Sequence, residues 1–450
     1  MKILVAVLLG AILVQAPKPV PDRTRKCGLG AAFHAGRRAA LRAKLEEGLV
    51  LVRGLPPTRE YAAFRQDKTF WYLTGVESPN AALLMDAKTG KEIFFLPKRN
   101  EGGEIWEGEL WDTSDAWVKE VTGFTDLRPI GDLAAVLKEE LASQKIVWTC
   151  SEPHVELAGC QDRAEPYDRR IERDPLDGRT SREKALADHL RNDFGAEVKD
   201  MRKVLDEMRR VKTAEEVDAI RRASQAGSVA MIEAMRSTRP GLGEWEIDAL
   251  MSFVHRREGA DGPAYHAIVG SGPNSLALHY SASSRVMNAG EVLLIDYAPE
   301  FDHYTSDITR TWPVDGKLTP RMEEIYRVVL AAQEAGIAAV KPGRTMGEIS
   351  RACTAVLEKH GMEKLMPHGA CHYVGMEVHD VGDGVPLEPG VVFTVEPGVY
   401  EPATGIGVRI EDVVVVTQDG CEVLSSGVPK ALEAVLALCA EEGLLDRRGK

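Results

Sequence analysis

The feature that most constrains this chain is a set of five metal-ligand side chains carried by β-type segments in its C-terminal half. Residues 292–296, 304–312, 391–396 and 408–416 are rich in Val, Ile and Thr, which is typical of strands. Strands hold side chains on a rigid backbone, as a metal site requires. The fold must therefore bring together Asp296, Asp307, His372, Glu396 and Glu411.

The chemistry of this set indicates a metal centre rather than scattered surface residues. One imidazole with four carboxylates suits divalent Mn, Fe, Co or Zn, and four carboxylates carry enough negative charge for two cations. Any one of the residues alone could be a turn or surface residue. A turn over Ala298–His303 would form a hairpin that places Asp296 and Asp307 side by side. Arg409 and Glu411, two apart in one predicted strand, would point to the same face.

Length and charge limit the class of protein. A chain of 450 residues has room for two or three domains with their own cores. Hydrophobic residues make up 44% and charged residues 28%, as in ordinary globular proteins. The net charge of −13 argues against nucleic acid or an anionic membrane as the main partner.

The N-terminal segment, residues 1–22, has the pattern of a secretory leader. Lys2 precedes an apolar run, Ile3–Val14, which is short for a bilayer span and ends near small residues. We therefore expect an exported, periplasmic or secreted protein. Pro17 is unfavourable directly after a cleavage site, so a different cut or an uncleaved anchor remains open. The alternative is a buried first strand of a cytoplasmic protein.

The seven cysteines form no C-x-x-C pair, which argues against a disulfide framework and against a zinc finger. A bridge between Cys150 and Cys160 in an oxidising compartment remains a minor alternative.

The order of predicted elements indicates two α/β domains. Residues 28–200 begin with a helix at Phe33–Glu47 and strands at Leu49–Val52, Ala81–Met85 and Lys91–Leu96, and include charge-rich loops such as Gln161–Thr180. The boundary is predicted at Met201–Lys212. From Thr213, which begins a capping box, to residue 440, helices are expected after Thr213, near 243, and at 319–339 and 345–360.

Several sequence pieces resemble the pita-bread metallopeptidases, and in detail the aminopeptidase P (Xaa-Pro aminopeptidase) family. They are HAIVGSGPNSLALHY (266–280), LLIDYAPEFDHYTSDITRTWPV (293–314), HGACHYVGMEVHDVG (368–382), LEPGVVFTVEPGVY (387–400) and GIGVRIEDVVVV (405–416). The stretch 61–75 is similar to the FRQ-x-x-x-F-x-Y-L-T-G signature of the family's N-terminal domain. The resemblance implies an N-terminal mixed-sheet α/β domain followed by a pita-bread catalytic domain.

The resemblance also implies roles for individual residues. Asp296 would hold one divalent cation, His372 and Glu396 a second, and Asp307 and Glu411 would bridge them. Mn(II) is the expected pair of ions, with Co, Zn or Fe as alternatives. The implied catalytic residues are Glu396, His379 and His279. The implied substrate-binding residues are His368, Tyr400 and Arg409.

The activity implied is release of the N-terminal residue from peptides with proline at position two, by a protein that forms homo-oligomers. The nearest alternative is an Xaa-Pro dipeptidase (prolidase), which must bind the free carboxylate of proline. No Arg or Lys beyond Arg409 is evident near the ligand motifs for that purpose. A non-catalytic pita-bread relative that binds peptide or protein is a third possibility. Packing is the interpretation for Trp106 and Trp111, and solvation for His303.

Overall fold

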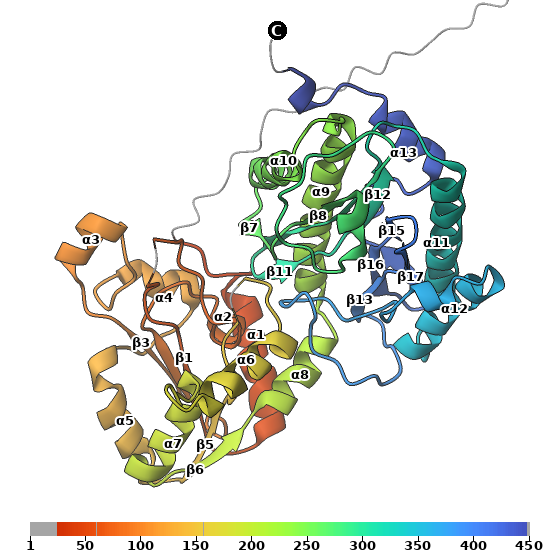
Figure 1. Cartoon of the computed structure of the whole chain (residues 1–450). Helices are drawn as coiled ribbons and strands as arrows, with labels where there is room; N and C mark the ends of the chain where they lie inside the picture. Colours follow the sequence, from red (N-terminus) through yellow and green to blue (C-terminus); the bar gives the residue numbers. More distant parts are fainter. Residues whose placement is uncertain (1–24, 60, 156, 448–450) are drawn as a thin grey trace, which may run out of the picture.

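The computed structural model describes residues 25–59, 61–155 and 157–447, so the predicted leader lies outside the described residues. Figure 1 shows two lobes joined through helix α8, Arg202–Arg210. The N-terminal lobe also contains helices α1 (Ala31–Leu45), α2 (Lys68–Thr74), α3 (Glu101–Glu107), α4 (Ala116–Thr122), α5 (Leu133–Glu140), α6 (Gln161–Arg173) and α7 (Arg182–Phe194).

A six-stranded mixed sheet forms the centre of the N-terminal lobe, in the order β4-β3-β2-β1-β5-β6. Its strands are β1 (Leu49–Arg53), β2 (Ala82–Asp86), β3 (Glu92–Leu96), β4 (Leu127–Pro129), β5 (Ile146–Thr149) and β6 (Glu197–Asp200). Strand β1 pairs antiparallel with β2 and parallel with β5. Val50 and Val52 face the core that contains α1 and α2, whereas Leu49 and Leu51 face the core under α5 and α7. Burial on both faces explains the continuous apolar run in β1.

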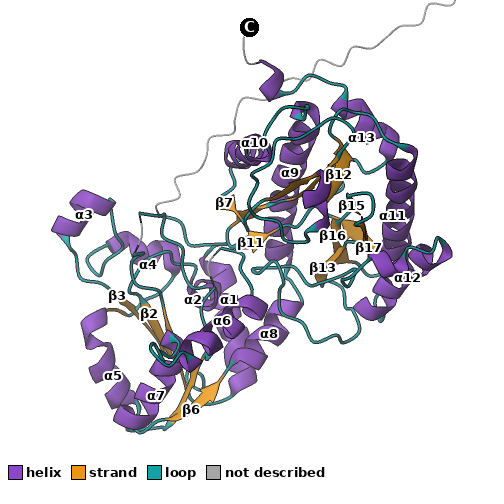
Figure 2. Ribbon diagram, in the orientation of Figure 1, coloured by secondary structure: helices purple, strands orange, loops and turns teal. Residues whose placement is uncertain are grey.

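The C-terminal lobe places its strands between two pairs of helices, as Figures 1 and 2 show. Helices α9 (Ala214–Ser237) and α10 (Glu244–Arg257) pack on the sheet β12-β9-β8, whose strands are Thr309–Pro313, Val292–Asp296 and Ile268–Ser271. The capping box predicted at the start of α9 is confirmed, with Thr213 and Glu216 bonding reciprocally.

The second helix pair covers the other half of this lobe. Helices α11 (Pro320–Ala339) and α12 (Met346–Lys359) pack on the sheet β13-β16-β17. The remaining elements of the lobe are β7 (Gly262–Pro263), β10 (Pro299–Phe301), β11 (Tyr304–Thr305), β13 (Val392–Val395), β14 (Gly398–Glu401), β15 (Ile406–Arg409), β16 (Asp412–Val416), β17 (Cys421–Val423) and α13 (Leu432–Cys439).

Two predicted strands are interrupted in the structure, each at a candidate ligand. The run 304–312 divides into β11 and β12 around Asp307, and the run 408–416 divides into β15 and β16 at Glu411. Arg409 and Glu411 therefore do not share one strand, and that prediction was wrong. At the breaks the backbone N–H of Glu411 donates to the carbonyl of Thr309 at 3.1 Å, and the Thr309 hydroxyl donates to the Glu411 carboxylate at 2.6 Å. Leaving the regular ladder frees both carboxylates to turn into the site.

The hairpin between Asp296 and Asp307 also differs from its prediction. Pro299–Phe301 is a strand rather than a turn, and only Asp302 and His303 have positive φ, at 50° and 63°. His303 is not solvated: it is 3% exposed, pairs with Glu77 of the N-terminal lobe, and its ring centroid lies 4.5 Å from that of Trp71. The hairpin is therefore part of the interface between the lobes.

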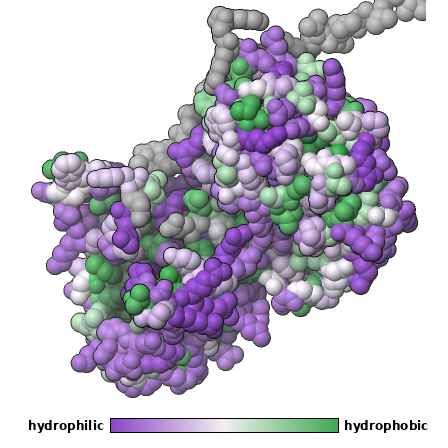
Figure 3. All heavy atoms as spheres, in the orientation of Figure 1, coloured by the Kyte–Doolittle hydropathy of each residue, from purple (hydrophilic) through white to green (hydrophobic). Residues whose placement is uncertain are grey.

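Tryptophan exposure, cysteine pairing and helix hydrophobicity bear on the remaining predictions about the fold. Trp111 is buried as predicted, whereas Trp106 on α3 is 85% exposed, so its assignment to packing was wrong. All seven cysteines, Cys150 and Cys160 among them, are free thiols. Within the described residues no helix is both long and apolar enough to cross a membrane. Figure 3 shows hydrophilic residues over most of the visible face of both lobes.

Candidate metal centre

The five predicted ligands line a single pocket of about 530 Å³. Asp296 ends β9, Glu396 directly follows β13, and His372 lies beside that strand, where the carbonyl of His372 accepts from the Thr394 N–H at 2.9 Å. With Asp307 and Glu411 at the two strand breaks, the four carboxylate ligands stand at the end or interruption of a strand, and His372 lies in the segment beside β13. Such positions combine a fixed backbone with room for a side chain to turn inward.

The imidazole of His372 lies beside three of the four carboxylates. Its Nε2 is 3.5 Å from Asp307 Oδ2, 3.4 Å from Glu396 Oε1 and 4.0 Å from Glu411 Oε1. Its Nδ1 lies 3.1 Å from the carbonyl oxygen of Tyr373, which can only accept, so Nδ1 carries the proton. Nε2 is then the nitrogen with the lone pair, as a metal ligand requires.

Asp296 and Asp307 are held side by side by a tyrosine that the sequence analysis missed. The Tyr265 hydroxyl lies 2.8 Å from Asp296 Oδ1 and 2.6 Å from Asp307 Oδ1, so it bonds to both carboxylates. From the other side Arg409 donates to Asp296 Oδ2 at 2.6 Å and to the Thr309 hydroxyl at 2.9 Å. Tyr265 directly precedes the 266–280 motif, and its spacing gave no signal of this contact.

The electrostatics of the pocket fit divalent cations. Burial, followed by repulsion from neighbouring carboxylates, raises the pKa of Asp307 and of Glu411 well above its usual range. Burial also raises the pKa of Glu396 to about 8, against the opposing effect of Arg409. Burial lowers the pKa of His372 to about 3. Each of these buried carboxylates makes ionisation of the others less favourable. Bound cations would stabilise the ionised carboxylates and the neutral imidazole, which are the forms that bind a metal.

A chain of hydrogen bonds forms one wall of the pocket. Arg409 Nη1 donates to the Tyr400 hydroxyl at 2.9 Å, and that hydroxyl lies 3.0 Å from His368 Nε2. Nδ1 of His368 lies 2.8 Å from the carbonyl oxygen of Gly369 and donates to it, so Nε2 accepts from Tyr400. Burial lowers the pKa of His368 to about 4, which keeps this ring neutral. The three predicted substrate-binding residues are thus one connected unit.

The two remaining predicted histidines, His279 and His379, line the same pocket. The ring centroid of His379 lies 4.4 Å from that of His372 and 6.4 Å from that of His279. Both histidines contact helix α6 of the N-terminal lobe, through Asp162 and Arg163. A loop was predicted over these two residues because the segment is highly charged, but the structure has a helix there, with Pro166 inside it.

Comparisons with known proteins agree with this fold and site. Residues 34–148 match "Aminopeptidase P, N-terminal domain", and residues 218–418 match "Metallopeptidase family M24". The Xaa-Pro aminopeptidase of Haemophilus influenzae is 33% identical over 402 residues, 82% of this chain and 87% of its own. The Xaa-Pro dipeptidase of Homo sapiens is 28% identical over 463 residues, 87% of this chain and 88% of its own. The structure of Pseudomonas aeruginosa aminopeptidase PepP superposes with a TM-score of 0.77 at 32% identity, covering 91% of this chain and 98% of that one.

The fold and the site therefore define a metallo-exopeptidase with an N-terminal mixed-sheet domain and a pita-bread catalytic domain, a family fold that implies a dinuclear metal centre. The chain belongs to the aminopeptidase P family of M24 metallopeptidases. The family and the fold class expected from the sequence are confirmed.

Proposed function

We propose that this protein is an Xaa-Pro aminopeptidase, which releases the N-terminal residue from peptides that carry proline at position two. The observation that carries the proposal is the convergence in one pocket of the five ligands, the histidines 279 and 379, and the His368–Tyr400–Arg409 unit. Asp296, Asp307, His372, Glu396 and Glu411 would hold two divalent cations, for which we propose Mn(II).

The residues of the chain have separable tasks in this reaction. When bound, the cations would supply Lewis acidity and a hydroxide nucleophile at neutral pH. Glu396 is proposed to accept the proton from the attacking water as its carboxylate. His279 is proposed to donate to the carbonyl oxygen of the scissile peptide as charge develops there, and His379 to orient the peptide and to transfer protons.

Specificity for proline follows from the wall of the pocket. A bond preceding proline is a tertiary amide without N–H, so the site needs no acceptor at that position. What it needs is an apolar slot for the ring. Ile268 and Leu278 line the pocket together with His368, and they would pack against the proline.

One observation favours a second candidate, an Xaa-Pro dipeptidase. The guanidinium of Arg163 lines the pocket, although the sequence analysis found no Arg or Lys beyond Arg409 for a free carboxylate. A cation at this end of the pocket is the group a dipeptide's carboxylate would bind. However, Arg163 Nη2 already donates to His279 Nδ1 at 2.7 Å, which favours a role for Arg163 in holding His279 instead.

The test compares four peptides at equal concentration: an Xaa-Pro dipeptide, a tripeptide and a pentapeptide beginning Xaa-Pro, and the pentapeptide with Ala in place of Pro. We expect cleavage of the tripeptide and pentapeptide after the first residue, slow turnover of the Ala peptide, and loss of activity on chelation that Mn(II) restores. Hydrolysis of the dipeptide without cleavage of the longer peptides would make the protein a dipeptidase. Full activity of a demonstrably metal-free preparation would refute a metal-dependent reaction.

We also propose that the protein forms homo-oligomers. Ile105 and Trp106 on α3 are 82% and 85% exposed, which is a large apolar surface for a lone helix of a monomer. Light scattering coupled to size exclusion measures the mass in solution, and a purely monomeric mass would contradict the proposal.

A further inference from the structure

The N-terminal lobe supplies one turn of helix that contacts two histidines of the pocket, His279 and His379. Asp162 and Arg163 are consecutive residues in the first turn of α6. Asp162 Oδ2 lies 2.9 Å from His379 Nδ1, and Arg163 Nη2 lies 2.7 Å from His279 Nδ1. The same ring nitrogen of each histidine is therefore bonded, but to side chains of opposite chemistry.

That difference assigns the tautomer of each ring. A guanidinium has donors and no acceptor, so Nδ1 of His279 accepts and, in the neutral ring, the proton is on Nε2. An ionised carboxylate has acceptors and no donor, so Nδ1 of His379 carries the proton and, in the neutral ring, Nε2 keeps its lone pair. Burial lowers the pKa of His279, which agrees with a neutral ring. Burial opposes the ionisation of Asp162, but hydrogen bonds from Cys160 and His379 outweigh it and lower its pKa.

We propose that Asp162 and Arg163 are positioning residues that hold the two active-site histidines in opposite tautomers. His379 then offers a bare Nε2 as an acceptor, and His279 offers an Nε2–H as a donor. The inference rests on the proposed function for the use made of these atoms, but the tautomers themselves are properties of the free protein. A peptide bound between the rings would meet one acceptor and one donor, which fixes the direction in which it lies.

The segment before α6 is attached to the catalytic lobe closely enough to keep this alignment. The Ala158 N–H donates to the carbonyl of Ala264, and the Val378 N–H donates to the carbonyl of Ala158, both at 2.8 Å. Val378 directly precedes His379, so the second of these hydrogen bonds joins the backbone next to the histidine to the segment before α6.

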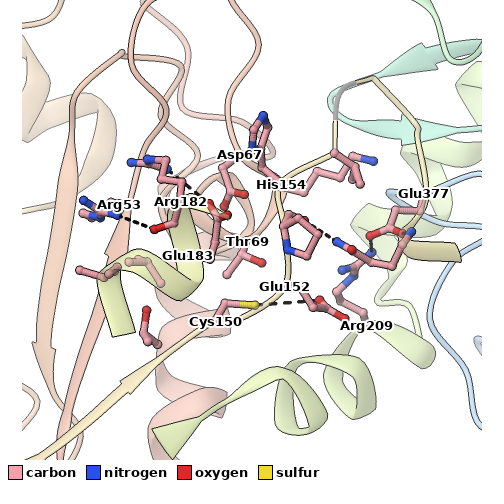
Figure 4. A pocket seen from close by; sticks show the side chains of 17 residues that line it. Arg53, Asp67, Thr69, Cys150, Glu152, His154, Arg182, Glu183, Arg209 and Glu377 are labelled. Carbon is pink, nitrogen blue, oxygen red and sulfur yellow. Dashed lines mark hydrogen bonds and ion pairs between the residues drawn. The ribbon is translucent and has the colours of Figure 1, made fainter. Parts of the chain in front are cut away.

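A buried ion pair secures the start of α6 as well. The Gln161 N–H donates to Glu377 Oε2 at 3.2 Å, and Arg209 holds the other oxygen of Glu377 at 3.0 Å. Figure 4 shows Arg209 and Glu377 side by side at the edge of a cavity of about 40 Å³ lined by residues of both lobes. Because Arg209 and Glu377 are 94% and 98% buried, this attachment does not exchange freely with water.

The experiment measures which ring nitrogen of His279 and of His379 carries the proton. Nitrogen-15-labelled histidine in the full-length protein, loaded with Zn²⁺ to avoid paramagnetism, is examined by two-bond proton–nitrogen correlation spectra. The signals of His279 and His379 are assigned by loss in single Asn variants. We expect Nε2–H for His279 and Nδ1–H for His379 in the wild type. Arg163→Ala and Asp162→Ala should each convert only the facing ring to a mixture of tautomers.

Kinetics give the second readout. Each Ala variant should lower kcat and kcat/KM alike by about 10–100-fold, the usual effect of losing a partner that orients an active-site group. Arg163→Lys, which still only donates, and Asp162→Asn, which keeps an acceptor oxygen, should restore both the tautomer and most of the rate. Asp168→Ala and Arg170→Ala, in the same helix, are matched controls that should change neither.

Two results would overturn the proposal. One is a wild-type spectrum with the same tautomer for both rings. The other is an Ala variant with unchanged tautomers, even if its turnover falls. Failure to cleave Xaa-Pro peptides, with the expected tautomers present, would instead refute the proposed function, because the spectra need no substrate.

Discussion

The buried guanidinium of Arg310 offers a quantitative test of how the metal-site strands are held in place. Arg310 is fully buried in β12, beside the ladder that carries Asp296. Its Nη2 donates to Asp412 Oδ1 at 2.7 Å, and its Nη1 donates to the carbonyl of Glu411 at 2.5 Å. Further bonds run to the carbonyls of Thr309, Val428 and Pro429. This one side chain therefore joins β12 to the break that contains Glu411.

Arg310→Met keeps much of the volume and removes every donor. Single hydrogen bonds to charged groups contribute about 1.5–3 kcal/mol, but they are not additive and the guanidinium loses its hydration on burial. Breaking a buried pair by removing one partner costs about 3–5 kcal/mol. Asp412 keeps bonds from Lys430 at 2.7 Å and Gln333 at 2.9 Å, which favours the lower part of that range. For a domain of this size each kcal/mol shifts Tm by roughly 2–4 °C, so we expect a fall of about 6–15 °C.

The assay is thermal unfolding of the cation-saturated protein, followed by tryptophan fluorescence at fixed scan rate and fixed free metal. Arg221→Met is the matched control, because Arg221 makes a two-pronged contact with Glu422 at 3.1 and 3.0 Å on the surface. That variant should lose no more than about 1 kcal/mol. Equal Tm values for the two variants would refute the argument that the buried contacts of Arg310 stabilise the fold more than an exposed ion pair does.

Four further predictions concern the site and the leader. Asp307→Asn should lower metal content and kcat together, by elemental analysis and turnover; unchanged metal content would contradict its place among the ligands. His379→Ala should keep the metals and lower kcat by about 10²–10⁴-fold, and loss of metal would contradict its separate role. Because the pKa of Glu396 is raised from 4.5 to about 8, this carboxyl binds more protons in the folded metal-free protein than in the unfolded chain between these values. Above pH 7, where the histidines with lowered pKa are neutral in both states, the Tm should therefore fall as pH rises toward 8, and saturating Mn(II) should remove that trend; a Tm that rises over this range without metal would contradict the sign. Cell fractionation and N-terminal mass spectrometry should find an exported protein, and a purely cytoplasmic pool with residues 1–16 intact would favour the buried-strand alternative.

Part of the convergence of the candidate ligands in one pocket could be predicted, because some of their signals are local. Asp296 and Glu396 end runs of β-branched residues, a pattern that favours buried strands, and both runs are buried strands in the structure. The breaks at Asp307 and Glu411 could not be predicted in this way. Val, Ile and Thr continue on both sides of each break, and only the facing contact between Thr309 and Glu411 shows that the ladder is interrupted there.

The partners of the histidines carry no local signal at all. Asp162 and His379 are 217 residues apart in sequence, and Arg163 and His279 are 116 apart. An Asp-Arg pair in a charged segment is indistinguishable from a solvated helix surface until the two lobes are placed together. The same reason explains His303, whose loop position indicated solvation although Trp71 and Glu77 of the other lobe bury it.

The two lobes contribute different groups to the candidate site. All five candidate ligands belong to the catalytic lobe, and so do Tyr265 and Arg409, which bond to them. The Nδ1 partners of His279 and His379 belong to the N-terminal lobe, which also contacts the hairpin through an ion pair of Arg65 with Glu300 at 2.6 Å. Metal binding and histidine orientation are therefore physically separable. Substitutions that loosen the lobe interface, such as Arg65→Ala, should reduce turnover while leaving metal content unchanged, whereas substitutions among the ligands must reduce both.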